Sequence, residues 1–174
     1  GPLSSSNSLV GATANDFVGA TPDLSSPYSA AYALAGGGYA VVSSGWGLGK
    51  GAVTLGAAGA AVVGAVSSSN SLVGSANGSL ANNIAYYNPT YYYYGGDQIG
   101  NGGNGAAVVT LPNNNYVVVS PYWSHNRGAV TLAPSTGMTG VVSASNSLVG
   151  TSAGTVTSSS GYNSYTGGDQ VGVN

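Results

Sequence analysis

A chain of 174 residues with 43% hydrophobic content is long enough to bury a core of its own. Its charge is unusual, because only 3% of the residues are charged and the net charge is −2. Two cations, Lys50 and Arg127, are too few to neutralise a phosphate backbone, which excludes nucleic acid as a partner. The absence of cysteine excludes disulfides, thiolate metal ligands and a cysteine nucleophile.

No run of the sequence reaches the roughly 18 to 20 apolar residues of a membrane span, so we expect no membrane span. The opening Gly1-Pro2-Leu3 is compatible with a cleavage scar or with a processed end. A surface with so little charge puts no electrostatic barrier between copies of the chain. We therefore expect the chain to associate with itself, without a cofactor or a bound metal.

The hexapeptide SNSLVG is the main signal, because it occurs three times, beginning at Ser6, Ser69 and Ser145. Its Leu-Val pair, closed by glycine, predicts a short strand in each copy. The copies divide a single all-β repeat domain, 1–174, into a partial unit 1–11, a unit 12–74, a unit 75–150 and a partial unit 151–174.

A turn follows in which an aspartate precedes an apolar residue and a glycine, around Asp16, Asp97 and Asp169. Inserts of variable length, rich in Tyr, Ser and Asn, accompany the later copies at 82–95 and 155–167. We interpret these inserts as loops.

Two related segments come next, Tyr39–Trp46 and Tyr116–Trp123, and GAVTL follows each of them at 51–55 and 128–132. Short β-branched or aromatic blocks bounded by Gly, Asn, Ser or Pro predict strands between tight turns. No apolar stripe of helical period is present, and surface helix formers are scarce. The pattern predicts four antiparallel strands per unit, which is the layout of a propeller blade.

The order of these segments resembles the phenylalanine-glycyl-glycyl-alanyl-prolyl repeats of integrin-type propellers. The matching residues are Gly96 to Gly100, Val108 to Leu111, Asn113 to Pro121 and Gly128 to Leu132. The calcium site of such blades is not carried over, because Pro112 to Asn115 offers no carboxylate.

The segment 141–150 is also similar to repeats of very large bacterial surface proteins of the filamentous-haemagglutinin type. That resemblance implies secretion, an extracellular or cell-surface location, and adhesion or matrix building. It implies no catalytic residue.

Two units cannot close a propeller ring of about four to eight blades, so we expect strands to be completed between chains. The residues expected to assemble head to tail are Leu9, Val10 and Gly11 at one end and Asp169, Gln170 and Val171 at the other. Removing residues 1–11 is then expected to abolish oligomers. The sequence does not choose between a filament and a closed ring.

Five of the six charged residues occupy equivalent repeat positions. One interpretation is a structural ion pair in each unit, Asp16 with Lys50 and Asp97 with Arg127. The alternative is that each carboxylate only accepts backbone N–H groups in its own turn. An exposed ion pair would contribute at most about 1 kcal/mol.

Aromatic residues are the remaining candidates for binding. Trp46 and Trp123 recur at one repeat position, where they either stack on sugar rings of a glycan or pack as core. The cluster Tyr91, Tyr92, Tyr93 and Tyr94 predicts contact with another chain or a surface, or covers a sheet edge of its own subunit.

Two functions fit these features. The first is a structural subunit of an extracellular bacterial fibre or matrix, or an adhesin repeat, and the alternative is a carbohydrate-binding lectin whose propeller is completed by oligomerisation. We do not expect an enzyme, because the one histidine, His125, lies in a polar turn with no oriented carboxylate beside it.

Overall fold

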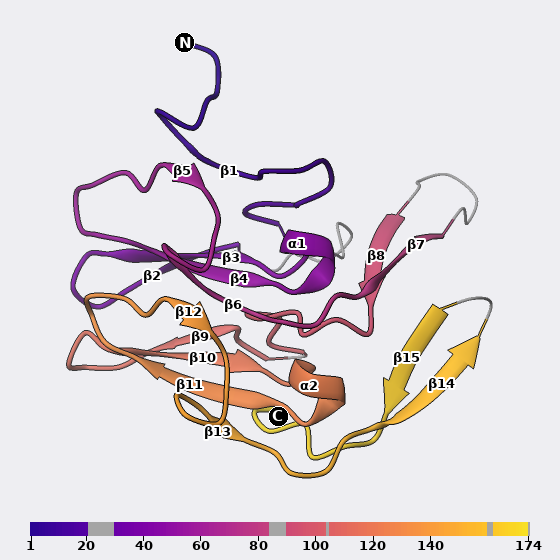
Figure 1. Ribbon diagram of the computed structural model, residues 1–174. Coiled ribbons are helices and arrows are strands. Elements are labelled where there is room, and N and C mark those ends of the chain that lie inside the picture. The colour runs from indigo at the N-terminus through magenta and orange to yellow at the C-terminus, as the bar shows by residue number, and fades with distance from the viewer. Residues whose placement is uncertain (21–29, 84–89, 104, 160–161, 174) are drawn as a thin grey trace.

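The computed structural model describes residues 1–20, 30–83, 90–103, 105–159 and 162–173, and β-strands dominate this part of the chain (Figure 1). The strands are β1 (Leu9–Val10), β2 (Ala31–Ala33), β3 (Tyr39–Ser43), β4 (Ala52–Gly56), β5 (Gly64–Ala65), β6 (Ser71–Val73), β7 (Ser79–Asn83), β8 (Thr90–Tyr94), β9 (Val108–Thr110), β10 (Tyr116–Ser120), β11 (Ala129–Ala133), β12 (Gly140–Val141), β13 (Leu148–Val149), β14 (Thr155–Ser159) and β15 (Tyr162–Thr166). The predicted β-rich repeat fold is confirmed. Two one-turn helices, α1 (Trp46–Gly49) and α2 (Trp123–Asn126), were not predicted, and neither is long enough to cross a membrane.

Each repeat builds one sheet. The first sheet has the strand order β12-β6-β4-β3-β2 and the second has the order β13-β11-β10-β9. Within each repeat the neighbouring strands are antiparallel, and the registers correspond, with Tyr39 opposite Gly56 and Tyr116 opposite Ala133. The two sheets lie one above the other in Figure 1, the first nearer the N-terminus. We call the side of a sheet that faces the N-terminal end its upper face and the opposite side its lower face.

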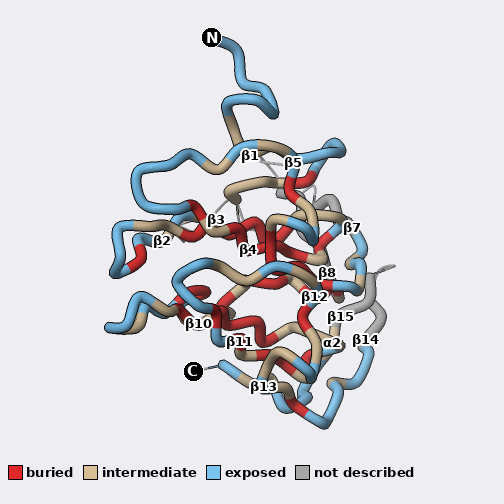
Figure 2. The backbone as a smooth tube through the Cα atoms, turned by 60° about the vertical axis from the view of Figure 1, so that its left-hand side comes forward, coloured by how far each residue is buried: buried red, intermediate tan, exposed pale blue. Residues whose placement is uncertain are grey.

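The core lies between the two sheets, where Figure 2 shows the buried chain. Alternate residues of a strand point to opposite faces, so Val42 and Val53 occupy the lower face of the first sheet and are each 1% exposed. Tyr116 and Val118 occupy the upper face of the second sheet and pack in the same cluster. Burying side chains of this kind stabilises the fold by about 1.5 to 3 kcal/mol each.

Adjacent repeats also share strands. β12 of the second repeat pairs parallel with β6 of the first, with Leu72 opposite Gly140. In the same way β1 pairs parallel with β5, with Leu9 opposite Gly64. The strands that end the first two SNSLVG copies, β1 and β6, are therefore each paired with the repeat that follows them in this chain.

Two hairpins, β7–β8 and β14–β15, project from one side of the stack (Figure 1). Each pairs over five positions, from Ser79 opposite Tyr94 and from Thr155 opposite Thr166. The prediction of loops at 82–95 and 155–167 was therefore wrong for the described residues. Tyr, Thr and Val in these inserts favour strands, and the interleaved Ser and Asn obscure the signal.

Candidate assembly interface

The asparagine of each SNSLVG copy closes the turn that precedes its strand. Asn70 Oδ1 accepts the backbone N–H of Ser67 at 2.9 Å, and Asn70 Nδ2 donates to the carbonyl of Ala65 at 2.9 Å. Asn7 and Asn146 make the same two bonds. The turn holds β5 and β6 in fixed relation, so that β5 pairs with the preceding repeat and β6 with the following one. Sequence reasoning gave this asparagine no role, although its identity in all three copies was the available signal.

The carboxylate of Asp97 joins three segments of the chain. It is 1% exposed, and its Oδ2 accepts the backbone N–H groups of Ser75 at 2.7 Å and Ala76 at 2.9 Å. Its Oδ1 accepts the N–H of Ser124, in the helical turn α2 beside the second sheet, at 2.9 Å. Hydrogen bonds to an ionised acceptor are stronger than those between neutral groups. We call this arrangement the aspartate clasp: one carboxylate oxygen binds the segment that directly follows an SNSLVG copy, and the other binds the residue after the tryptophan of the next sheet.

Asp16 forms the clasp with the first repeat. Its Oδ2 accepts Ala12 N–H at 2.7 Å and Thr13 N–H at 2.9 Å, and its Oδ1 accepts Gly47 N–H at 3.3 Å. Gly47 and Ser124 occupy the same repeat position, directly after the tryptophan. Four residues separate Gly11 from Asp16, whereas 22 separate Gly74 from Asp97. The clasp therefore forms with or without a hairpin in the connection.

Asp169 makes only half of the clasp. Its Oδ2 accepts the N–H groups of Thr151 at 2.6 Å and Ser152 at 2.8 Å, and these N–H groups lower the pKa of Asp169. The side chains of Thr151 and Ser152 also hydrogen-bond this carboxylate, but among the described residues no backbone N–H of a helical turn such as α1 or α2 donates to it. The Asp169 carboxylate is exposed to solvent, whereas the other two clasp aspartates are buried.

The predicted ion pairs are replaced by the clasp. In the described part of the chain neither Asp16 nor Asp97 forms an ion pair with Lys50 or Arg127, and both carboxylates are 5% exposed or less. Their oxygens are occupied by N–H groups, as the alternative interpretation expected. Arg127 Nη1 instead donates to Ser124 Oγ at 3.4 Å. The described residues contain no group of three His, Asp or Glu side chains placed to hold a metal ion.

The helical turns α1 and α2 place the N–H group that the clasp uses. Both contain residues in the left-handed region, with φ of 64° at Leu48, and of 49°, 63° and 62° at Ser124, His125 and Asn126. Such a conformation costs roughly 1 to 2 kcal/mol for each residue other than glycine. In α2 the strain is offset by contacts with β15, because Asn126 Nδ2 donates to the Tyr165 carbonyl at 3.0 Å and the rings of His125 and Tyr165 stack at 4.7 Å.

The aspartate turn rests on a glycine that follows each helical turn. Gly51 forms a parallel bridge with Ile99, and Gly128 forms the same bridge with Val171. A Cβ atom on either glycine would lie 2.1 Å from the bridging residue's backbone nitrogen. The structure therefore seats Gln170 and Val171 on the second repeat of their own chain, where the carbonyls of Asn126 and Arg127 accept their N–H groups at 2.9 and 3.0 Å.

The two tryptophans pack at the boundaries between repeats. Trp46 contacts the cluster of Ala52, Val66 and Val73, and Trp123 contacts the core between the sheets. Both indole N–H groups are buried and have no hydrogen-bond partner among the described residues. This packing is the core role that was weighed against sugar stacking.

The tyrosine cluster Tyr91–Tyr94 forms most of β8, which pairs with β7 through the backbone. The side chains of these four residues lie outside what the structure describes. Their contact with another chain or a surface stays a prediction.

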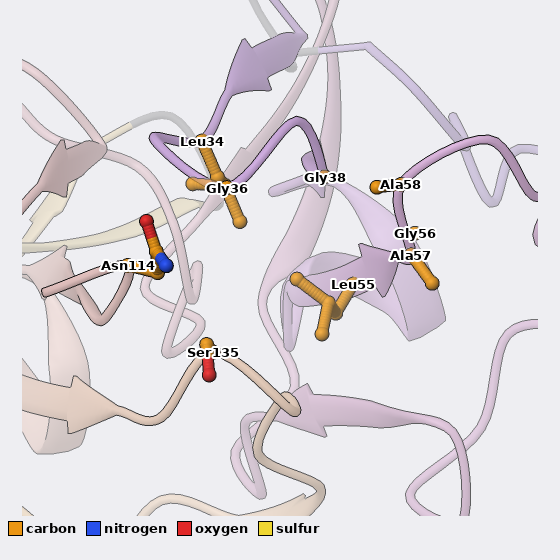
Figure 3. A pocket seen from close by; sticks show the side chains of 9 residues that line it. All are labelled: Leu34, Gly36, Gly38, Leu55, Gly56, Ala57, Ala58, Asn114 and Ser135. Carbon is orange, nitrogen blue, oxygen red and sulfur yellow. The ribbon is translucent and has the colours of Figure 1, made fainter.

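A cavity of about 220 Å³ lies at the end of the stack opposite the hairpins (Figure 3). Leu34 and Leu55 line it from the first repeat, and Asn114 and Ser135 line it from the second. The remaining wall consists of glycine and alanine. The cavity marks the boundary between the repeats and carries no charged side chain.

The sequence of the repeats matches one family model. The model of a family described as "Repeat of unknown function (DUF5650)" matches residues 1–20, 33–82 and 110–159, more than half of the chain. The chain belongs to this family. The two longer DUF5650 matches each contain one tryptophan turn, and the short match contains β1 and Asp16. Searches of curated proteins and of solved structures return no match. The DUF5650 match supports a repeat protein and carries no link to filamentous haemagglutinins or integrin-type propellers.

The last DUF5650 repeat exposes the face that the first one buries. Leu72 of β6 is 1% exposed where the second repeat packs against it, whereas its counterpart in β13, Leu148, is 70% exposed. Leu55 in β4 is half-buried, and its counterpart in β11, Leu132, is 58% exposed. Within the described part of the chain, the lower face of the second sheet therefore leaves Leu132 and Leu148 exposed, and the outer edge of β13 has no strand partner.

Proposed function

We propose that this chain is a structural, non-enzymatic element of an extracellular bacterial fibre, matrix or adhesin, in which like repeats stack head to tail by strand pairing. The observation that carries the proposal is the contrast between Leu72 and Leu148. The residue at the same repeat position is 1% exposed where the second repeat packs against it and 70% exposed on the lower face of the second sheet. The lower face of the second sheet is built to receive another repeat.

The contacts that would bind such a repeat are seen between the two repeats of this chain. The following repeat supplies a parallel strand to β6 and an N–H group to Asp97. At the C-terminal end β13 and Asp169 present the corresponding strand edge and carboxylate oxygen. A repeat added there would bind by main-chain pairing, by the clasp and by burial of the exposed leucines.

Composition supports an assembly role over a lectin. With 3% charged residues, stacked copies meet little electrostatic repulsion. Sugar stacking needs a presented aromatic face, and the rings of Trp46 and Trp123 pack between repeats instead.

The proposal is tested by lengthening the chain with one more repeat. A second copy of residues 75–150 is inserted after Gly150, which places Ser75 after a glycine, as in the original junction with Gly74. We expect the added repeat to stack, so that the maximum dimension from small-angle X-ray scattering grows by roughly 10 Å, the spacing of packed sheets.

The substitution Leu148→Asp then tests burial at this position. In the lengthened chain it is made at the original Leu148, which precedes the inserted repeat. In the original chain this substitution is expected to cost less than about 0.5 kcal/mol, because the side chain is exposed. In the lengthened chain it is expected to cost about 3 kcal/mol or more, because an unpaired charge is buried. Val63→Asp, 42% exposed and distant from the junction, is the control and should have the same small effect in both chains. An equal, small cost of Leu148→Asp in both chains would contradict stacking.

A further inference from the structure

We infer that Asn101 is a site of spontaneous covalent modification, at which the backbone nitrogen of Gly102 attacks the carboxamide and a carboxylate results. The inference goes beyond the proposed function and holds whether or not repeats stack between chains. The site lies at the junction of the two sheets. The neighbouring Gly100 donates its N–H to Ser120 Oγ of the second sheet at 3.2 Å, and a Cβ atom on Gly100 would lie 2.7 Å from the Val53 side chain of the first.

The attacking group is a glycine nitrogen that no hydrogen bond engages. Asparagine before glycine favours this reaction, because glycine has no Cβ atom to hinder the nitrogen. The chain contains three such dipeptides, Asn77-Gly78, Asn101-Gly102 and Asn104-Gly105. The Gly78 N–H donates to the Leu48 carbonyl at 2.7 Å, and the Gly105 N–H donates to the Gly102 carbonyl at 3.0 Å. Within the described ranges the Gly102 N–H itself makes no hydrogen bond, so this nitrogen is the available one.

The carboxamide of Asn101 is held beside that nitrogen at both of its ends. Its Oδ1 accepts the Gly103 N–H at 3.2 Å, and this bond closes a ring of atoms that includes the Gly102 nitrogen. A donor at Oδ1 stabilises the negative charge that develops there when Cγ is attacked. Asn101 Nδ2 donates to Gln98 Oε1 at 2.7 Å, which fixes the plane of the carboxamide. Such positioning lowers the entropic cost of ring closure.

A cavity of about 20 Å³ adjoins the site. Asn101 and Gly102 line it together with Tyr32 of β2. One water molecule needs roughly 10 to 15 Å³ of such space, so the cavity admits a single water. The second step of the reaction consumes one water at this position.

The reaction needs no cofactor and no second protein. The Gly102 nitrogen loses its proton and bonds to Asn101 Cγ, and the bond from Cγ to Nδ2 breaks. Nδ2 leaves as ammonia and takes up the proton that Gly102 released. Water then opens the five-membered ring at either of its carbonyl carbons, which leaves aspartate or isoaspartate at position 101. In sum, one carboxamide and one water give one carboxylate and one ammonium ion.

The product weakens the junction of the two sheets. An oxygen replaces Asn101 Nδ2, so two acceptors face each other where Nδ2 donated to Gln98 Oε1. Isoaspartate also adds a methylene to the main chain next to Gly102, where a Cβ atom would already lie 2.6 Å from the Ala107 nitrogen and the Gly105 carbonyl oxygen. The junction therefore loosens as the protein ages, and its lifetime is set by the conversion of one residue.

Ageing the purified full chain at mildly alkaline pH tests the site. Chymotryptic fragments read by electron-transfer dissociation give separate rates for Asn77, Asn101 and Asn104. In the folded chain we expect Asn101 to convert at least about tenfold faster than the other two, a modest part of what one oriented donor contributes in an enzyme. In denaturant the three rates should become similar, because the dipeptide is the same. Equal rates in the folded chain, or a ranking that unfolding leaves unchanged, overturn the proposal.

Two substitutions test the effect on the junction. Asn101→Gln keeps an amide, but its extra methylene disfavours ring closure, so its Tm should stay constant on ageing. The Tm of the original chain should fall by about 2 to 4 °C as conversion completes. Asn101→Asp should show the lowered Tm from the start, and Asn77→Gln, the matched control, should age like the original chain. An equal fall of Tm in Asn101→Gln and the original chain overturns the effect on the junction.

Discussion

At the scale of single residues, Gly51 and Gly128 decide how closely the aspartate turn approaches the sheet. Both have positive φ, 77° and 79°, and both lack room for a Cβ atom because the backbone of Ile99 or Val171 lies against them. Gly59 also has positive φ, 69°, but has no atom within 4 Å of its Cβ position. Substituting Gly59 therefore measures the cost of a left-handed backbone alone. Substituting Gly51 or Gly128 adds the cost of steric overlap with the neighbouring backbone.

Gly51→Ala is therefore expected to destabilise the protein by about 3 kcal/mol, the sum of left-handed strain and overpacking. Gly59→Ala should cost only about 1 kcal/mol, because strain alone applies. Denaturant unfolding monitored by tryptophan fluorescence measures both. Equal losses of stability in the two variants would show that the aspartate turn can move away from the new Cβ atom at residue 51 without cost.

At the scale of elements, the hairpins are insertions that the aspartate clasp does not require. The connection from Gly11 to Asp16 has no hairpin and still forms the clasp. The hairpin β14–β15 contributes the stack of His125 on Tyr165 and the bond from Asn126. These contacts support α2 and lie outside the clasp.

Replacing residues 151–168 by Ala-Thr-Ala-Asn, the sequence at 12–15, is expected to leave a folded protein. The loss of the Asn126 bond and the ring stack should lower stability by about 1 to 2 kcal/mol. Thermal unfolding followed by circular dichroism provides the measurement. In the shortened background, Asp169→Ala should lower Tm further if Asp169 still accepts the N–H groups of the new connection, and an unchanged Tm would show that it does not.

At the scale of the whole molecule, two sheets enclose one core, and very few charged side chains take part in their packing. The net charge is −2, and the described residues hold the repeats together by apolar burial and backbone hydrogen bonds. This separates the molecule from repeat arrays that are joined by ion-pair networks.

Stability is consequently expected to change little with ionic strength. Between about 0.01 M and about 0.15 M sodium chloride the Debye length falls from about 30 Å to about 8 Å, yet Tm should move by less than about 2 °C. Differential scanning calorimetry across that range checks this expectation, and a steep salt dependence would reveal an electrostatic contact.

The sequence predicted the strands well, because SNSLVG, Tyr-Val-Val and GAVTL are short β-forming blocks between glycines. It also singled out Asp16, Asp97 and Asp169 through their recurrence. It did not choose between ion pairs and N–H groups, since that depends on where Gly47 and Ser124 lie in space. The left-handed turns escaped prediction because Ser124, His125 and Asn126 hold positive φ only through contacts made elsewhere in the fold.

The parallel pairs between repeats have a directional consequence. In β6–β12 and β1–β5 the two strands run the same way, so one repeat is carried onto the next by translation and rotation, without a two-fold axis. Any assembly that uses this contact is polar, and its two ends present different strand edges. Growth and termination at the two ends would then be distinct chemical events, and a reagent that binds one end would leave the other free to elongate.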